Sequence, residues 1–444
     1  MKKEMQEMAN SGIRNGKKTR IGFFLGIAAV LLCSLSAAYA QPAPEQLGSI
    51  YYAYPAPTGK LTPVPAGYEP FYVSHYGRHG SRWMTADERY TEVLAVFDSL
   101  ALCSGLTPLG RDVRERLHRV WEDARGCSGS ITPLGARQQR EIAGRLFRNY
   151  PQIFGDSARV DARSSTSLRC AMSMSFFTER LKEQNPRLRV SRRAYNKYMD
   201  YIAHTSPRAE AFVSEEAAWR KDFRDFESRN VRSARLMASL FVRPADVEDP
   251  DALMRGLYWI AADMQNVEPD ISFYDVFEYG ELLGLWKTVN ARMYVCNAAA
   301  PLNGGLMPRQ AVPLLRNILE EAERAVHNAV SPESLSAGKT PAPAAHLRFG
   351  HDTHLIRLLA LMQVEGCCIA EADMEKFHLA WQDYRVAPMS ANLQIVFFRN
   401  KAGGDILVKL LLNEEEARLP LKSDLAPYYP WKAVKAFWEK QAGL

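Results

Sequence analysis

Strand-like and helix-like segments alternate at both ends of this 444-residue chain, and the alternation limits the folds available to it. Near the N-terminal end, the apolar stretch FYVSHY at 71–76 precedes a helical pattern from about 87 to 102. Near the C-terminal end, AHLRFGHD at 345–352 precedes a helical segment from 353 to about 362 that is apolar nearly all round, which predicts burial. Strands alternating with helices favour an α/β fold.

The segments between these two regions extend the pattern. Two near-copies of one helix start, LTPLGRDVRERL from Leu106 and ITPLGARQQREIAGRL from Ile131, place a threonine where it can cap a helix and a proline at the first helical position. SARVDARSST then predicts a strand ending in Arg163, with a helix at about 166–182.

The middle of the chain, from about 191 to 305, has a helical pattern without a convincing strand. LQIVFFRN and DILVKLLLN, joined by KAGG, predict a β-hairpin near the C-terminal end. The pattern as a whole predicts α/β structure at both ends of the chain and a helical insertion between them.

The first 40 residues have the order of a secretory signal peptide. A basic lead precedes the uncharged run IGFFLGIAAVLLC and the small-residue ending SAAYA. An uncleaved membrane anchor is the alternative, but the run is short for a membrane span. We therefore expect cleavage after Ala40, export to the periplasm or the medium, and no stable membrane insertion of the mature chain.

Net charge argues against a nucleic-acid partner. The chain carries 56 basic and 50 acidic residues, and its first 40 residues hold six and two of them, which leaves 50 and 48. A nearly balanced mature chain has no broad basic surface. Recognition of an anion must therefore be local.

Six cysteines follow the predicted signal peptide, and an even number in an exported chain permits disulfides. Cys103 and Cys127 flank one helical segment and are the pair that we expect to be bridged. No CxxC or CxxH spacing indicates zinc.

The segment HYGRHGSRW at 75–83 concentrates cationic side chains at the end of a predicted strand, where α/β folds place ligands. Arg78 and Arg82 can direct their planar guanidinium groups to one tetrahedral anion. Gly77 and Gly80 would let the backbone approach that ligand. Surrounding cations lower the pKa of His79, which favours a neutral, nucleophilic imidazole. A solvated loop with chance arginines is the alternative.

FGHDTHL, from 349 to 355, has the same strand-to-helix layout. His351 can donate to a phosphate oxygen, and Asp352 can give a proton to a leaving alkoxide. Asp352 could instead only cap the helix. A metal site made of His351, Asp352 and His354 is disfavoured, because adjacent residues on a helix point to different faces.

Together, RHGSR at 78–82 and HD at 351–352 resemble the histidine acid phosphatases, the second branch of the histidine phosphatase superfamily. ITPLGARQ, ARSSTSLRC, PMSANLQIVFF and VKLLLNEEE match in the expected order between about 51 and 420. GARQQREIAGRLFRNYPQIF most resembles the multiple inositol polyphosphate phosphatase and phytase-like subgroup. That subgroup usually has His-Ala-Glu where this chain has His-Asp. The resemblance therefore predicts the reaction more specifically than the substrate.

The resemblance implies a role for each matching residue. His79 would attack phosphorus and become a phosphohistidine, and Asp352 would protonate the leaving oxygen. The residues implied to hold the phosphate oxygens are Arg78, Arg82, Arg163 and His351. No metal ion or other cofactor is implied, and the partner would be a small-molecule phosphate ester.

The resemblance also implies the architecture: a three-layer α/β core with a mostly parallel sheet, formed by residues 48–190 and 310–444, and an α-helical cap inserted at 190–310. A basic start to this cap, with Arg192, Arg193 and Lys197, would favour a polyanion such as phytate, although a solvated helix face is the simpler interpretation. A general acid phosphatase for sugar or nucleotide monophosphates and a non-catalytic anion-binding protein are the alternatives.

Overall fold

One eight-stranded sheet lies at the centre of the residues that the structure, a computed structural model, describes, namely 41–330 and 342–444. The strands are β1 (Tyr68–Arg78), β2 (Arg159–Ser164), β3 (Arg189–Arg193), β4 (Ala345–Gly350), β5 (Asn392–Asn400), β6 (Ile406–Leu412), β7 (Glu415–Ala417) and β8 (Tyr428–Pro430). Their order is β3-β2-β4-β1-β5-β6-β7, with β8 also paired to β6. The four strands from β3 to β1 are parallel, and the rest pair antiparallel. The expected α/β class is confirmed.

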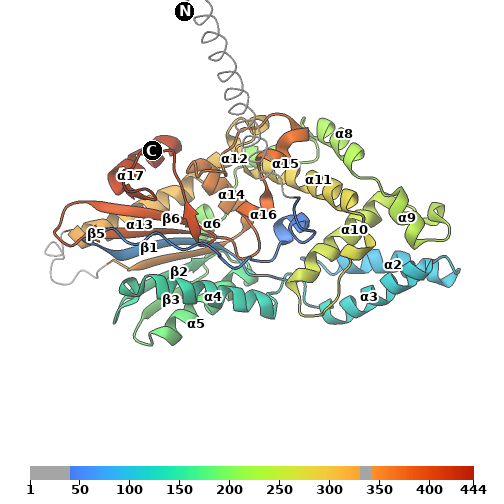
Figure 1. Ribbon diagram of the computed structural model, residues 1–444, viewed down its shortest axis with the longest axis horizontal. Coiled ribbons are helices and arrows are strands. Elements are labelled where there is room, and N and C mark those ends of the chain that lie inside the picture. The colour runs from blue at the N-terminus through green and yellow to red at the C-terminus, as the bar shows by residue number, and fades with distance from the viewer. Residues whose placement is uncertain (1–40, 331–341) are drawn as a thin grey trace, which may run out of the picture. The chain divides into compact units, whose positions relative to one another are not determined.

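Helices cover both faces of this sheet, as Figure 1 shows. α4 (Pro133–Asn149) and α5 (Leu168–Gln184) lie on one face, and α13 (Val312–Val330), α14 (Asp352–Leu361) and α17 (Trp431–Ala442) lie on the other. Successive strand residues divide between the two faces, because side chains alternate along a strand. Tyr72 packs with the second set of helices, and its neighbour Val73 packs with the first.

The remaining elements connect or extend these layers. The other α-helices are α2 (Glu88–Leu102), α3 (Pro108–Ala124), α6 (Met199–Ile202), α7 (Pro207–Val213), α8 (Arg220–Asn230), α9 (Ala234–Leu240), α10 (Pro250–Asp263), α11 (Tyr279–Asn297), α12 (Leu306–Arg309), α15 (Phe377–Ala380) and α16 (Asp383–Val386). The described 3-10 helices are η1 (Gln46–Tyr51), η2 (Pro151–Phe154), η3 (Asn196–Tyr198), η4 (Pro244–Asp246), η5 (Met264–Asn266), η6 (Tyr274–Val276), η7 (Pro301–Asn303) and η9 (Met374–Lys376). Within the described ranges, no helix is both long and apolar enough to cross a membrane.

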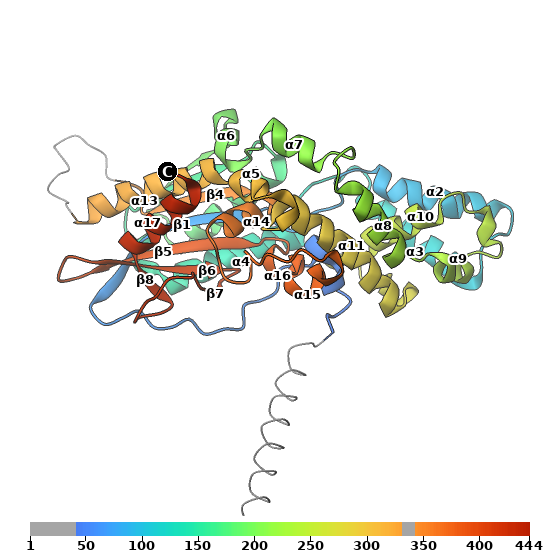
Figure 2. The same cartoon turned by 90° about the horizontal axis from the view of Figure 1, so that it is seen from above.

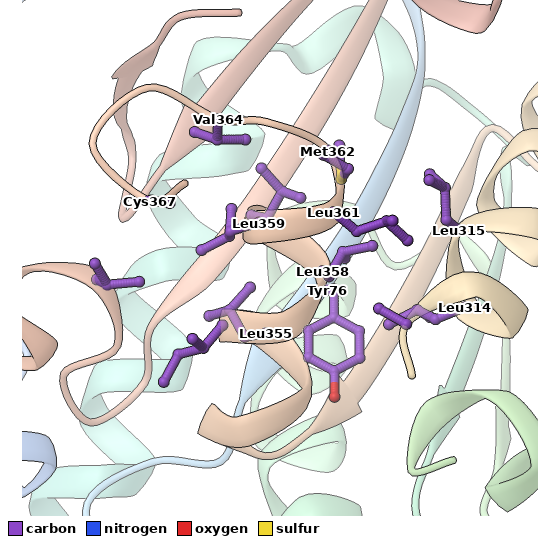
Figure 3. Close-up of a cluster of buried hydrophobic side chains, with 14 of the residues drawn as sticks. Tyr76, Leu314, Leu315, Leu355, Leu358, Leu359, Leu361, Met362, Val364 and Cys367 are labelled. Atoms are coloured by element: carbon purple, nitrogen blue, oxygen red, sulfur yellow. The ribbon is translucent and has the colours of Figure 1, made fainter. Parts of the chain in front are cut away.

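The helix α14 is buried, as its apolar sequence predicts. Leu355 and Leu358 are fully buried. Figure 3 shows them among side chains of other elements, including Leu315 of α13 and Tyr76 of β1. Because α14 is packed in this way, its first residue, Asp352, has a fixed position at the edge of the sheet.

A second group of helices packs beside the sheet layers around its own buried apolar cluster. The cluster includes side chains from α2, α3, α9, α10 and α11. These five helices lie together in Figure 2. Residues 88–124 therefore contribute to it as well as residues from the predicted cap. The boundaries at 190 and 310 stay a prediction, as does the signal peptide at 1–40, which lies outside the described residues.

Two sequence-based expectations need correction. Strand β3 occupies 189–193, where the sequence shows no apolar alternation, because an edge strand that pairs only with β2 keeps most of its charged side chains in solvent. The expected Cys103–Cys127 bridge is wrong. Both thiols are free, and the Sγ of Cys103 donates to the carbonyl of Leu100 in the preceding helix turn, at 3.3 Å.

The two near-identical helix starts form the predicted caps. The hydroxyl of Thr107 accepts from the amide of Gly110 at 3.0 Å, and that of Thr132 accepts from Gly135 at 3.1 Å. Both glycines also allow a close backbone approach. A Cβ at Gly135 would lie only 2.1 Å from the carbonyl oxygen of Ser81, so the start of α4 and the loop after β1 touch backbone to backbone.

We predict that Gly135→Ala lowers the free energy of unfolding by about 1–3 kcal/mol, because the added methyl group must push this loop away. Gly280→Ala is the matched control: it also changes a helical glycine, but its Cβ would meet no atom within 4 Å. Its free energy of unfolding should stay unchanged or rise slightly. Denaturant titration of both variants measures the difference. Equal stability of the two variants would contradict the packing argument.

Candidate functional site

Parallel pairing of β1 with β4 brings the two sequence motifs together. Arg78, the last residue of β1, lies opposite Gly350, the last residue of β4. The next amide along the first strand, that of His79, donates to the carbonyl of Gly350 at 3.1 Å. His79 and His351 therefore emerge side by side at the C-terminal edge of the sheet, with their ring centroids 5.5 Å apart.

The His79 ring is held in one tautomer. Its Nδ1 lies 2.9 Å from the carbonyl oxygen of Gly80, and because a carbonyl can only accept, Nδ1 must carry the proton. Nε2 of the neutral ring then has a free lone pair. Burial, followed by the charges of Arg78 and Arg82, holds the pKa of His79 well below its usual value, so the ring stays neutral in mild acid.

Asp352 forms an ion pair with Arg78. Its Oδ2 lies 2.9 Å from Nη2 of Arg78, and its Oδ1 accepts from the amide of Thr353 at 2.7 Å. Burial raises the pKa of Asp352, but the charges of Arg78 and His351 outweigh it, and the net pKa lies below the usual value. In the structure as it stands, Asp352 is therefore a carboxylate at neutral pH.

A third arginine joins the cluster, and it is Arg169 from the first turn of α5. Its Nη2 lies 3.0 Å from Nε2 of His351. Since an arginine can only donate, the neutral His351 ring accepts at Nε2. Burial, opposed by the charge of Asp352 but supported by that of Arg169, lowers the pKa of His351 to about 4.

The structure does not bring Arg163 into this cluster. Its Nη2 pairs with Asp161 at 2.7 Å and with Glu321 of α13 at 3.1 Å, and its Nη1 donates to Tyr201 at 3.1 Å. Asp161 and Arg163 are two residues apart on β2, so both side chains lie on the α13 face of the sheet. The guanidinium of Arg163 is thereby occupied away from His79.

The position of Arg169 in the sequence indicates its role, although it does not lie at the end of a strand. Asp352 reaches the site from the first turn of the helix that follows β4. Arg169 holds the equivalent place in the helix that follows β2. A search of first helical turns after each parallel strand would have selected it. Tyr51, whose hydroxyl accepts from Nη1 of Arg82 at 3.1 Å, has no such signal, because it precedes β1 in a 3-10 helix.

The residues expected to bind substrate at the start of the cap have other partners. Nε of Arg192 donates to the hydroxyl of Thr178 at 2.6 Å, and Arg193 pairs with Asp161. The Nζ of Lys197 lies 5.7 Å from the ring centroids of both Tyr195 and Tyr198. None of these contacts reaches His79, the three clustered arginines or Asp352. A role for these three residues in substrate binding stays a prediction.

Neighbouring helices hold the loop that carries the cluster. The amide of Gly80 donates to the hydroxyl of Ser173 in α5 at 3.0 Å, and the amide of Ser81 donates to Oε1 of Gln138 in α4 at 3.0 Å. The close packing of Gly80 against Gly135, rather than approach of a ligand, explains why this loop position must be glycine. Side chains of two helices thus hold the loop in place through its amides.

A buried acid lies behind Arg82. Asp263 is fully buried, and its Oδ2 accepts from the hydroxyl of Tyr90 at 2.6 Å; that hydroxyl in turn accepts from the amide of Met84 at 3.0 Å. Burial, partly offset by the hydrogen bond from Tyr90 and the charge of Arg82, raises the pKa of Asp263 to about 7. Asp263 thus supports the segment that follows Arg82.

The cluster has buried donors without protein acceptors. The Nε–H groups of Arg78, Arg82 and Arg169 are all buried, and none donates to an atom of the described residues. Leaving three charged donors unsatisfied is costly, and an oxyanion would accept from them. Across 41–330 and 342–444, no three His, Cys, Asp or Glu side chains gather as a possible metal site.

Comparison with solved structures identifies the fold. The multiple inositol polyphosphate phosphatase of Bifidobacterium longum in complex with inositol hexasulfate is 16% identical, with a TM-score of 0.72 over 89% of this chain and 98% of that chain. The same protein in complex with phosphate is 17% identical, with a TM-score of 0.71 over 89% of this chain and 98% of that chain. The phytase from D. castellii is 16% identical, with a TM-score of 0.65 over 90% of this chain and 85% of that one. No family model and no curated protein matches the sequence. The chain therefore has the fold of these phosphatases, as the motif resemblance implied.

We predict that Arg169→Ala weakens the binding of inorganic phosphate by about tenfold or more, the usual effect of losing hydrogen bonds to a charged group. Arg163→Ala should leave phosphate affinity nearly unchanged but lower the melting temperature, because it leaves Asp161 and Glu321 without their shared partner. Calorimetric titration and thermal unfolding measure the two effects. A larger loss of phosphate affinity in Arg163→Ala would reverse the two roles.

Proposed function

We propose that this protein is an exported phosphomonoesterase that acts through a phosphohistidine intermediate. The observation that carries the proposal is the neutral His79 imidazole, with a free Nε2, surrounded by buried arginine donors that lack acceptors. A phosphate ester supplies the missing acceptors and places its phosphorus atom before a nucleophile. A protein that only bound anions would gain nothing from a tautomer fixed in this way.

In the first step, Arg78, Arg82 and Arg169 bind the phosphate oxygens and neutralise their charge. Nε2 of His79 attacks phosphorus as the bond to the leaving oxygen breaks, and Asp352 gives that oxygen a proton. The Gly80 carbonyl stabilises the resulting imidazolium by accepting from Nδ1–H. In the second step, Asp352 takes a proton from water, the water oxygen bonds to phosphorus, and the bond to Nε2 breaks to release phosphate.

The charge of the substrate prepares Asp352 for this role. In the structure, Arg78 keeps the carboxylate ionised. A phosphate dianion at Arg78 would place negative charge beside Asp352 and raise its pKa, which favours the protonated acid. The proton-donating form is nevertheless lost as pH rises, whereas His79 stays neutral in acid. Both effects favour activity at acidic pH.

The substrate class that we propose is inositol polyphosphates, including phytate. The neighbour from Bifidobacterium longum forms complexes with inositol hexasulfate and with phosphate, and its fold covers nearly nine tenths of this chain. Assaying release of phosphate from phytate, sugar phosphates and nucleotide monophosphates compares this class with a general acid phosphatase. The export component rests on the predicted signal peptide, and N-terminal sequencing of the mature protein tests it.

We predict that His79→Ala abolishes turnover while the protein stays folded, because no other side chain of the cluster offers a neutral nitrogen lone pair directed by a carbonyl. Acid-quenched reaction with a phosphorylated substrate should leave an acid-labile, base-stable phosphoryl group on the wild-type protein alone. Circular dichroism verifies the fold of the variant. Substantial turnover by folded His79→Ala would overturn the proposed nucleophile.

We predict that Asp352→Asn reduces turnover of alkyl phosphates by about a hundredfold or more, within the range of general acid catalysis. The reduction should be much smaller for p-nitrophenyl phosphate, because nitrophenolate leaves without a proton. The fall of kcat with rising pH should also disappear in the variant, since the acid that titrates in the enzyme–substrate complex is gone. Equal losses for both leaving groups would show that Asp352 only orients Arg78 or caps α14.

A further inference from the structure

The 3-10 helix η1 contacts Arg78 and Arg82, the two arginines on either side of His79 in the sequence. The carbonyl of Ile50 accepts from Nη1 of Arg78 at 2.6 Å, and the hydroxyl of Tyr51 accepts from Nη1 of Arg82 at 3.1 Å. The guanidinium carbon of Arg82 also lies 4.8 Å from the centre of the Tyr51 ring. Ile50 and Tyr51 are consecutive residues that precede β1 in the chain. Together they contact the guanidinium groups of both Arg78 and Arg82.

These contacts determine which edge of each guanidinium stays available. Nη1 of Arg78 is fully engaged, because it also donates to the carbonyl of Ala387 at 2.9 Å. Nη1 of Arg82 likewise donates to the carbonyl of Trp83 at 2.9 Å. In both residues the Nε–H has no acceptor in the protein. The turn thus engages Nη1 of each planar group, Asp352 pairs with Nη2 of Arg78, and the Nε–H of each arginine is left without a protein acceptor.

Three side chains from two remote parts of the chain hold η1 in place. The hydroxyl of Tyr258 in α10 donates to the carbonyl of Leu47 at 2.7 Å. The side-chain amide of Asn266 donates to the carbonyl of Tyr51 at 2.7 Å. The hydroxyl of Ser49 donates to Asp383, which is fully buried and also accepts from the indole of Trp286 at 3.0 Å.

Ser49 has a backbone conformation that favours glycine. Its φ is 60° and its ψ is −137°, a region in which a side chain is strained. Strain of this kind persists where the surrounding structure holds the residue. Here the Ser49 hydroxyl forms the buried contact with Asp383 that a glycine would lack. The hydroxyl, and not the backbone conformation, accounts for serine at this position.

We propose that η1 is a positioning element of the phosphate site, in which Tyr51 aligns Arg82, the Ile50 carbonyl aligns Arg78, and Asp383 fixes the turn through Ser49. This inference rests on the proposed function, since the anion that it serves is phosphate. Tyr51 and Ser49 act through the arginines and are not catalytic residues. Pre-aligned guanidinium groups lose less freedom when the anion binds, which increases affinity.

The first test is the affinity of the full mature protein for inorganic phosphate, measured by calorimetry at mildly acidic pH. Tyr51→Phe removes only the hydroxyl that Arg82 contacts, and we expect phosphate to bind about tenfold more weakly. Tyr294→Phe is the matched control, because it removes a buried hydroxyl that donates to the carbonyl of Ile369 at 2.7 Å, outside the site. The control should lose stability but keep wild-type phosphate affinity.

The second test separates alignment from stability. Ser49→Gly relieves the backbone strain but removes the contact with Asp383, so we expect a melting temperature near that of the wild type together with weaker phosphate binding. This variant decides the question if Tyr51→Phe fails to fold. Wild-type affinity in either folded variant would overturn the inference alone. Failure of the wild-type protein to bind phosphate would overturn the proposed function and this inference with it.

Discussion

The parallel pairing of β1 with β4 is the interaction on which the rest of the site depends. It places Arg78 opposite Gly350 and lets the His79 amide donate to the Gly350 carbonyl. Because side chains alternate along a strand, a shift of one residue would turn Arg78 toward the other face and separate it from Asp352. The apolar packing of both faces resists such a shift. Burial of α14 then fixes where Asp352 stands relative to β1.

A second constraint is the concentration of buried positive charge at the sheet edge. Arg78 has no exposed surface and His79 only 2%, so neither can rely on water for solvation. The protein compensates in part: Asp352 pairs with Arg78, carbonyl groups accept from the Nη1 atoms, and Asp263 lies behind Arg82. The compensation is incomplete at the three Nε–H groups. These three donors are the ones that the phosphate of the proposed substrate would satisfy.

The choice between Arg163 and Arg169 shows how alternation and helix geometry divide roles among similar residues. Both arginines lie within the segment ARSSTSLRC, six residues apart. Arg163 belongs to the strand, and its side chain lies on the α13 face with Glu321. Arg169 belongs to the first turn of the next helix, and this turn lies over the sheet edge beside His351. Proximity to a strand end is therefore a weaker guide than position in the following helix.

The sequence by itself determined the α/β class, the two TPLG helix starts, the buried helix after 351 and, through the motif resemblance, the meeting of the RHG and HD motifs. Each of these depends on local periodicity, on capping residues, or on the rule that parallel strands place their carboxyl ends together. Tertiary structure alone decided that β3 is an edge strand, that Arg169 and not Arg163 reaches the site, and that Tyr51 contacts Arg82. These outcomes depend on which face or edge a side chain meets after distant segments pack. Ser49 and Asp383, 334 residues apart, meet only because η1 and α16 pack against each other in the folded chain.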